Sequence, residues 1–117
     1  MPLLLIPEGA TPADLFGETD LLPGQDWLEK ETLLVYASAM QQNRFPWARM
    51  QAQQPMAIHV GTNGKVLTQG HHRWAAARLA GVAIPVEVVR YTDYLDVGMV
   101  VPFAHTWAEV TWKKAQE

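Results

Sequence analysis

Residues 65–81 constrain the fold of this chain more than any other segment. A strand-like run, Lys65–Gln69, leads through Gly70 into the alanine-rich helix Trp74–Ala80, and Gly81 can end that helix in a left-handed conformation. Gly70 allows either a positive φ or a close approach of the backbone to another group. A strand that passes directly into a helix in this way predicts a domain in which a sheet and helices share one core.

A hairpin is predicted immediately before this segment. Met56, Ile58 and Val60 are apolar at alternate positions, which is typical of a half-buried strand. The turn Gly61–Gly64 contains an Asn-Gly step, the strongest short signal for a hairpin. Lys65–Gln69 is therefore expected to be the returning strand.

Further elements are predicted on both sides of the hairpin. They are a helix capped by Asp26 and Glu29 that ends near Asn43, a short helix at Trp47–Gln53, a strand at Ile84–Val89, and a C-terminal helix that starts with the capping box Thr106–Glu109. Residues 1–25 hold four of the eight prolines and are expected to form an arm with one short strand, Leu3–Ile6. Residues 26–117 then form a single compact α+β domain, with a small mixed sheet flanked by helices.

Charge and composition exclude several classes of protein. A net charge of −3 argues against a DNA-reading protein that relies on a broad basic face. The chain has no cysteine, which rules out disulfides, thiolate catalysis and cysteine-bound zinc. The apolar run near the start is too short for a signal peptide or a membrane span, so we expect a soluble protein without membrane insertion.

The sequence Gly70-His71-His72-Arg73 at the start of the alanine-rich helix is the best candidate for a functional site. The first turn of a helix offers unpaired N–H groups and the positive end of the helix dipole. Arg73 adds a guanidinium that can grip phosphate or carboxylate with two hydrogen bonds. His71 and His72 can bind a ligand or move protons near neutral pH. Structural roles are the alternative for residues of this segment: His71 can cap the helix, and Trp74 can be part of the core.

These motifs together resemble the ParB/sulfiredoxin-like superfamily, which includes ParB-type nucleases. Its members carry a strand, a box of the Gly-His-His-Arg type, an alanine-rich helix that ends in glycine, and an Ile-Pro-Val strand. The matching segments here are Thr68–Arg73, Trp74–Gly81 and Ile84–Val86, and their order and spacing agree over about residues 26–91. In that family the box holds the phosphates of a nucleotide or nucleic acid at the start of the helix.

Differences from particular branches narrow what the resemblance implies. Sulfiredoxins need a cysteine where this chain has His71, and related boxes often carry an acidic residue where this chain has Gln69. No helix-turn-helix pattern follows, as partition proteins would require. The resemblance therefore implies a phosphate-handling enzyme of the polymorphic-toxin branch, an antibacterial nuclease (DNase) or a nucleotide-hydrolysing (ATPase- or CTPase-like) domain. Such a domain would belong to a larger secreted effector, act in the target-cell cytoplasm and have a cognate immunity protein.

The resemblance and the chemistry of the box together assign the candidate residues. His71, His72 and Arg73 are expected to be catalytic. The residues expected to bind substrate are Thr68, Gln69, Gly70, His59 and Glu31. A nucleotide is expected as substrate or ligand, and a divalent cation such as Mg²⁺ is expected for phosphate chemistry, with no ligands assigned to it.

Three other functions fit parts of the same pattern. One is a non-catalytic module that binds a nucleotide and switches a partner. Another is a small-molecule kinase of the free-serine type, which needs an acidic residue poised over the box. The third is an HNH-type nuclease, which needs a further metal ligand on the following helix, where this chain instead has alanines.

Overall fold

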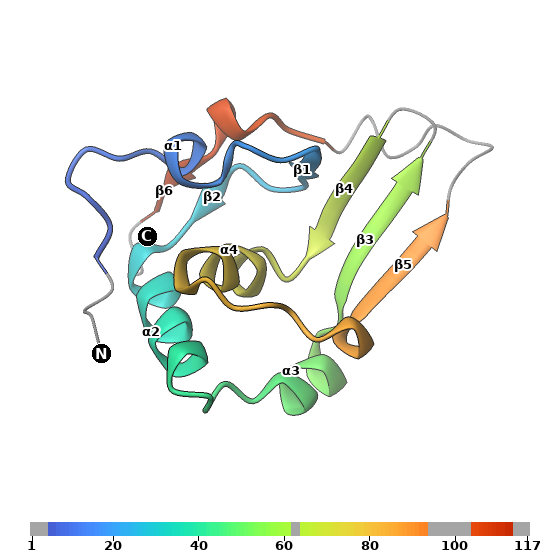
Figure 1. The fold of residues 1–117 in the computed structure, drawn as a ribbon. Coiled ribbons are helices and arrows are strands. Elements are labelled where there is room, and N and C mark those ends of the chain that lie inside the picture. Colours follow the sequence, from blue (N-terminus) through green and yellow to red (C-terminus); the bar gives the residue numbers. More distant parts are fainter. Residues whose placement is uncertain (1–4, 62–63, 94–103, 114–117) are drawn as a thin grey trace.

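A four-stranded mixed sheet forms one half of the molecule (Figure 1). The computed structural model describes residues 5–61, 64–93 and 104–113. The strands are β1 (Leu21–Pro23), β3 (Met56–Gly61), β4 (Gly64–Gln69) and β5 (Val89–Asp93), in the spatial order β1-β4-β3-β5. β3 and β4 are antiparallel, whereas β1 pairs with β4 and β5 pairs with β3 in parallel. The expected α+β class with a mixed sheet is confirmed.

The predicted hairpin is present as β3 and β4, although Thr62 and Asn63 of its turn lie outside the described residues. The register shifts between Ala57 and Ile58, so that Thr68 is an extra residue on β4. A bulge of this kind bends its strand and re-aims the neighbouring side chains. It lies at the end of β4 that leads into the next helix, where the candidate site begins.

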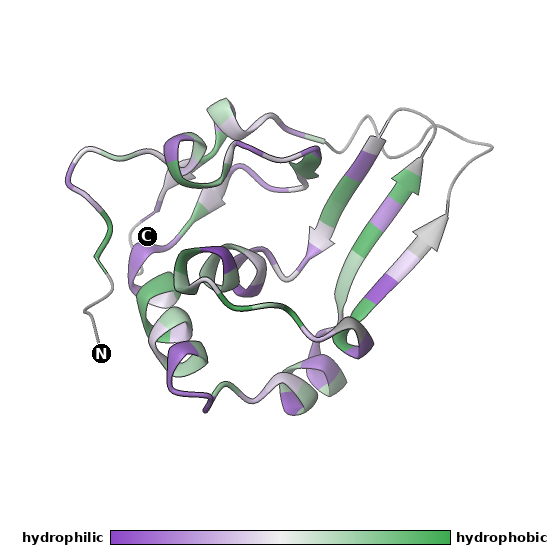
Figure 2. Cartoon of the chain, viewed as in Figure 1, coloured by the Kyte–Doolittle hydropathy of each residue, from purple (hydrophilic) through white to green (hydrophobic). Residues whose placement is uncertain are grey.

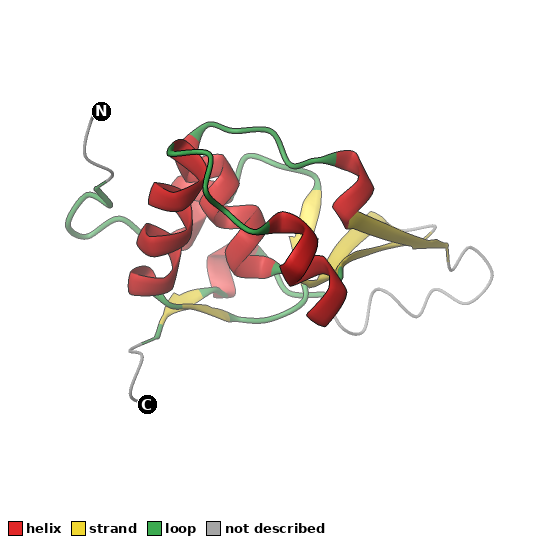
Figure 3. Ribbon diagram, turned by 90° about the horizontal axis from the view of Figure 1, so that it is seen from below, coloured by secondary structure: helices red, strands yellow, loops and turns green. Residues whose placement is uncertain are grey.

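Four α-helices accompany the sheet and gather in one half of the molecule when it is seen from below (Figure 3). They are α1 (Pro12–Phe16), α2 (Lys30–Gln41), α3 (Trp47–Gln53) and α4 (His71–Ala80). Figure 1 shows α4 between α2 and the sheet, and its three buried alanines, Ala75–Ala77, allow close packing there. Gly81 ends α4 in the predicted left-handed conformation, with a φ of 72°. α3 has the predicted bounds, is largely hydrophilic in Figure 2 and buries no residue.

Residues 12–23 correct the prediction of an irregular arm. Thr11 caps α1 through its side chain, and Phe16 at the end of α1 is fully buried. β1 then joins the sheet beside β4, with Leu21 opposite Lys65. Two of the four prolines that suggested an arm, Pro12 and Pro23, occupy the first turn of α1 and the end of an edge strand, both positions where a missing N–H is tolerated. Of the predicted strand Leu3–Ile6, Leu3 and Leu4 lie outside the described residues, and the other two residues are not in a strand.

At two predicted helix starts, the helix expected there does not form. Residues near Asp26 form β2 (Trp27–Leu28), which pairs in parallel with β6 (Thr111–Trp112), so that α2 begins only at Lys30. The capping box of Thr106 and Glu109 is confirmed, but it starts a single 3-10 turn rather than a C-terminal helix. The backbone N–H groups of Thr111 and Lys113 instead bond to carbonyls of the 26–28 segment.

The strand predicted at Ile84–Val89 is also shifted along the chain. Val86–Val88 forms a 3-10 turn, in which the Val88 N–H bonds to the carbonyl of Pro85, and β5 starts at Val89. Pro85 has no N–H to offer a sheet, and the chain begins pairing with β3 only after the turn. The Ile-Pro-Val motif therefore precedes the strand rather than forming it.

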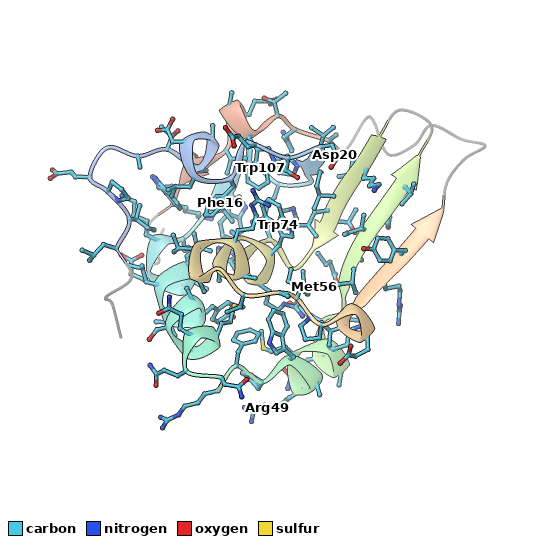
Figure 4. The ribbon with its side chains drawn as sticks, in the orientation of Figure 1. Phe16, Asp20, Arg49, Met56, Trp74 and Trp107 are labelled. Atoms are coloured by element: carbon cyan, nitrogen blue, oxygen red, sulfur yellow. The ribbon has the colours of Figure 1, made fainter. Side chains whose placement is uncertain are left out.

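Aromatic side chains join the first and last described segments to α4. Trp74 is buried and stacks on Trp107 with ring centroids 5.1 Å apart, and Phe16 packs against both rings (Figure 4). The Trp107 indole N–H donates to the carbonyl of Leu21 in β1 at 2.9 Å. Trp74 thus has the core role that was expected of it. No helix within the described parts of the chain is long and apolar enough to cross a membrane.

Candidate anion-binding pocket

A pocket of about 420 Å³ lies at the start of α4. Its floor is the segment from Thr68 to Arg73, which contains the whole predicted box and the end of β4. The other lining residues come from the 24–29 segment, α2 and the region of α3, and they are Gln25, Trp27, Tyr36, Met50 and Gln54. None of the described lining residues is acidic.

Backbone geometry at Gly70 sets the direction in which α4 leaves the sheet. Gly70 is the N-cap residue of α4 and has a φ of 90°, in the left-handed region that favours glycine. A Cβ at this position would lie 2.5 Å from Cγ of Met56, so a side chain is excluded by sterics as well as by φ. The positive φ predicted for this glycine is observed. Its backbone also lies close to Met56 of β3.

The first turn of α4 is not capped by a side chain. Gly70 accepts the first helical hydrogen bond, from the N–H of Trp74 at 2.9 Å, but it has no side chain to bond the N–H groups of the first turn. These N–H groups and the positive end of the helix dipole lie where the pocket is lined by residues 70–73. An uncapped helix start that opens into a pocket favours an anionic ligand.

Arg73 is the strongest single feature of the pocket. Only 3% of the residue is exposed, yet its guanidinium forms no ion pair with any carboxylate of the described residues. One terminal nitrogen, Nη2, donates to the carbonyl of Gln54, and the other, Nη1, is buried without a hydrogen-bond partner. Burial lowers the pKa of Arg73, with the nearby Tyr36 acting weakly in the other direction. A buried cation with an unsatisfied donor is costly, and an anion in the pocket would offset that cost.

His71 is buried and faces away from free solvent. Its Nε2 accepts a hydrogen bond from the backbone N–H of Gly24 at 2.9 Å, so Nε2 carries no proton and the ring is neutral. Burial, with a smaller contribution from the adjacent His72, lowers the pKa of His71 to about 4. A neutral, backbone-bonded imidazole at pH 7 acts first as a structural acceptor.

His72 also accepts a backbone hydrogen bond through Nε2, from a residue five positions after Gly24. Its Nε2 accepts from the backbone N–H of Glu29 at 3.0 Å, and its ring lies 5.5 Å from that of Trp27. Burial lowers the pKa of His72, partly opposed by the carboxylate of Glu29. Both histidines thus join the start of α4 to the 24–29 segment.

The remaining predicted residues divide between the pocket and other surfaces. Thr68 and Gln69 line the pocket, and the Thr68 hydroxyl donates to the carbonyl of Ala57 across the bulge. His59 is on β3 and Glu31 is exposed in the first turn of α2, and neither lines the pocket. The assignment of these two residues to substrate binding is not supported by their positions.

Five lining residues were not predicted, because they come from three separate parts of the chain. A metal site is not apparent either, since the described residues contain no group of three or more His, Cys, Asp or Glu side chains placed to hold an ion.

Comparison with known proteins gives no match to a family model, a curated protein or a solved structure. The resemblance to the ParB/sulfiredoxin-like superfamily therefore remains a prediction from the sequence. The function has to be inferred from the pocket itself.

Proposed function

We propose that this protein binds a phosphate group of a nucleotide or nucleic acid at the start of α4. The observation that carries the proposal is Arg73, which is buried with Nη1 unpaired and without an ion pair to any carboxylate in the part of the chain that the structure describes. Together with the uncapped N–H groups of α4, it supplies directional donors for a tetrahedral anion. The volume of about 420 Å³ leaves room for more than the phosphate alone.

A nuclear magnetic resonance titration with inorganic pyrophosphate tests this binding directly. The backbone amides of His71, His72 and Arg73 should show the largest shifts, since these residues line the pocket in the uncapped first turn of α4. Amides at the far end of α4, near Gly81, serve as an internal control. The proposal fails if pyrophosphate shifts no amide of the first turn, or shifts both ends of α4 equally.

Hydrolysis of the bound phosphate ester or anhydride is the second proposal for this pocket. It includes the nuclease and nucleotide-hydrolysing activities that the toxin resemblance implies, together with an immunity partner. Arg73 and the helix dipole can stabilise negative charge that develops on a phosphoryl oxygen. His72 lines the pocket beside Arg73, which favours it as the proton carrier. Its Nε2 accepts the Glu29 N–H, however, so that bond must open before this nitrogen can take a proton.

Two of the predicted accompaniments fit the pocket less well. A divalent cation finds no set of side-chain ligands among the described residues, so no catalytic step is derived through one. The free-serine-type kinase needs a carboxylate over the box, and the described lining contains none. Binding of phosphate, with or without turnover, is therefore the function that the geometry favours.

Turnover is tested by incubating the purified protein with nucleoside triphosphates and, separately, with plasmid DNA, with and without Mg²⁺. Product formation by the wild type that Arg73→Met abolishes would support hydrolysis. Pyrophosphate binding without product formation on any substrate would contradict hydrolysis and leave the non-catalytic nucleotide-binding module.

A further inference from the structure

His71 and His72 act together on one segment of the chain, residues 24–29. Each ring presents Nε2 as an acceptor to a backbone N–H of that segment, at Gly24 for His71 and at Glu29 for His72. The two hydrogen bonds fix both ends of a stretch that contributes Gln25 and Trp27 to the pocket. This pair of contacts is defined here as the histidine clasp.

Within the described residues, the clasp supplies the side-chain hydrogen bonds that join this segment to α4. Between its fixed ends, the Gln25 side chain bonds to the carbonyl of Trp27 within the same segment. β2 pairs with β6 and not with the larger sheet, and Gly24 packs closely on the carbonyl of Leu67 in β4. These contacts hold the segment to β6 and β4, whereas its attachment to α4 depends on the two imidazoles.

We propose that His71 and His72 are positioning residues that hold the Gln25–Trp27 wall of the pocket against α4, and that protonation of their rings releases this wall. An imidazolium carries a proton on both nitrogens and cannot accept a hydrogen bond. Uptake of a proton at Nε2 would place two N–H groups against each other, at Gly24 or at Glu29. The wall is thus closed while the rings are neutral and opens as the pH falls.

Some of the groups around the two rings oppose protonation of the imidazoles, and others favour it. His71 has His72 beside it on α4 and His105 facing it from the segment before the 3-10 turn, and both oppose its protonation. Its hydrogen bond with the backbone of Leu67 favours protonation. The Glu29 carboxylate favours protonation of His72, and Lys113 Nζ lies 4.7 Å from the centroid of the neighbouring Trp27 ring. Burial is the largest influence on both rings and lowers both pKa values, so the clasp is closed at neutral pH and opens under acid conditions.

Amide hydrogen exchange of the full chain without ligand tests the clasp, so its outcome is independent of the phosphate proposal. Between pH 7 and pH 5, protection of the Gly24 amide, corrected for intrinsic exchange, should fall by about twentyfold, as expected when a single proton binds an imidazole whose pKa is 6.5 in the released segment and about 4 in the closed one. The Glu29 amide should lose protection in the same direction. The Trp74 amide, which bonds to Gly70 within α4, serves as a control and should not follow this slope.

Matched substitutions separate titration from simple packing. Glutamine can place an acceptor oxygen near the position of Nε2 but does not titrate, so His72→Gln should keep Glu29 protected at both pH values. His72→Leu removes the acceptor and should leave Glu29 unprotected at both. The same two substitutions at His71 test the protection of the Gly24 amide. If the His71 variants do not fold, the His72 variants test the clasp alone, since His72 is only half-buried.

The clasp is disproved if corrected protection of Gly24 and Glu29 is the same at both pH values. It is also disproved if His72→Gln loses protection at Glu29 with acid as steeply as the wild type does. If His72 had only a structural role, both variants would show weaker amide protection at Glu29, and the fall of that protection with pH would remain.

Discussion

Arg73 is the residue whose environment is hardest to explain by stability alone. A buried arginine without an ion pair to any carboxylate of the described residues is unfavourable, and apolar residues of similar volume often replace buried charges without loss of stability. Within the described residues its guanidinium donates to the carbonyl of Gln54, a neutral acceptor that does not balance the charge. A residue that costs stability while lining a pocket is best understood through what it binds.

Gly70 is predicted to tolerate alanine poorly, because it combines a positive φ with close packing on Met56. Gly70→Ala should lower the free energy of unfolding by about 2–4 kcal/mol, from the positive φ and from overpacking against Met56. Gly81→Ala is the matched control on the same helix, because Gly81 has a φ of 72° and nothing within 4 Å of its Cβ position. Denaturant unfolding of both variants checks this, and equal losses would show that Met56 does not constrain Gly70.

The histidine clasp also makes an element-scale prediction for stability. The pKa of His71 is lowered from 6.5 to about 4, so the unfolded chain binds a proton at a higher pH than the folded chain does. The stabilisation is complete above about pH 6.5 and decreases as the pH falls towards 4. Between pH 7 and pH 5 the wild type should lose about 2 kcal/mol that His71→Gln does not lose. Parallel pH profiles of unfolding free energy for the two proteins would contradict this.

The indole of Trp107 is predicted to join β1 to the C-terminal turn. Trp107→Phe keeps most of the ring packing but leaves the Leu21 carbonyl without the indole donor in a buried position, at a cost of about 1–3 kcal/mol. Trp112→Phe is a matched control, since its indole donates to Ala10 at a half-buried position. Thermal unfolding should rank Trp107→Phe as the more damaging change. The reverse order would show that the contact between β1 and the C-terminal turn is not an important one.

Elements with local signals were predictable from the sequence, whereas those made by distant pairing were not. The β3–β4 hairpin, α3 and the end of α4 at Gly81 depend on turn, proline and glycine signals within a few residues. β1, β2 and β6 are two or three residues long and exist because they pair in parallel with segments far away in the sequence. A capping box at Thr106 marks where a helix can start, but it does not determine whether the helix continues.

The pocket likewise combines residues that were predictable from local sequence with residues that only the fold brings together. Its floor is contiguous in sequence and was predicted residue by residue, while its walls come from segments that only the fold brings together. The roles of the two histidines were not predicted, since a backbone N–H partner leaves no sequence pattern. Burial, which turns an imidazole from a proton carrier into a neutral acceptor, is likewise a property of the folded chain.

For the molecule as a whole, residues 12–25 are predicted to be part of the folded unit. Phe16 and Leu21 belong to the core, and Gly24 supplies one contact of the histidine clasp. A chain that lacks residues 1–25 should lose cooperative unfolding, because the core loses Phe16 and the sheet loses an edge strand. Circular dichroism during thermal unfolding checks this. A truncated chain that unfolds with the midpoint of the full chain would show that the segment is only an arm.

The central claim is that Arg73 and the start of α4 form an anion site, and calorimetric titration with pyrophosphate tests it most directly. The decisive comparison is Arg73→Met with Arg78→Met, which removes the same charge from an exposed position of the same helix. We predict that Arg73→Met weakens binding at least about tenfold while leaving the free energy of unfolding within about 1 kcal/mol of the wild type, or higher. Arg78→Met should bind almost as the wild type does. Equal affinity in the two variants, or no binding by the wild-type protein, would contradict the claim.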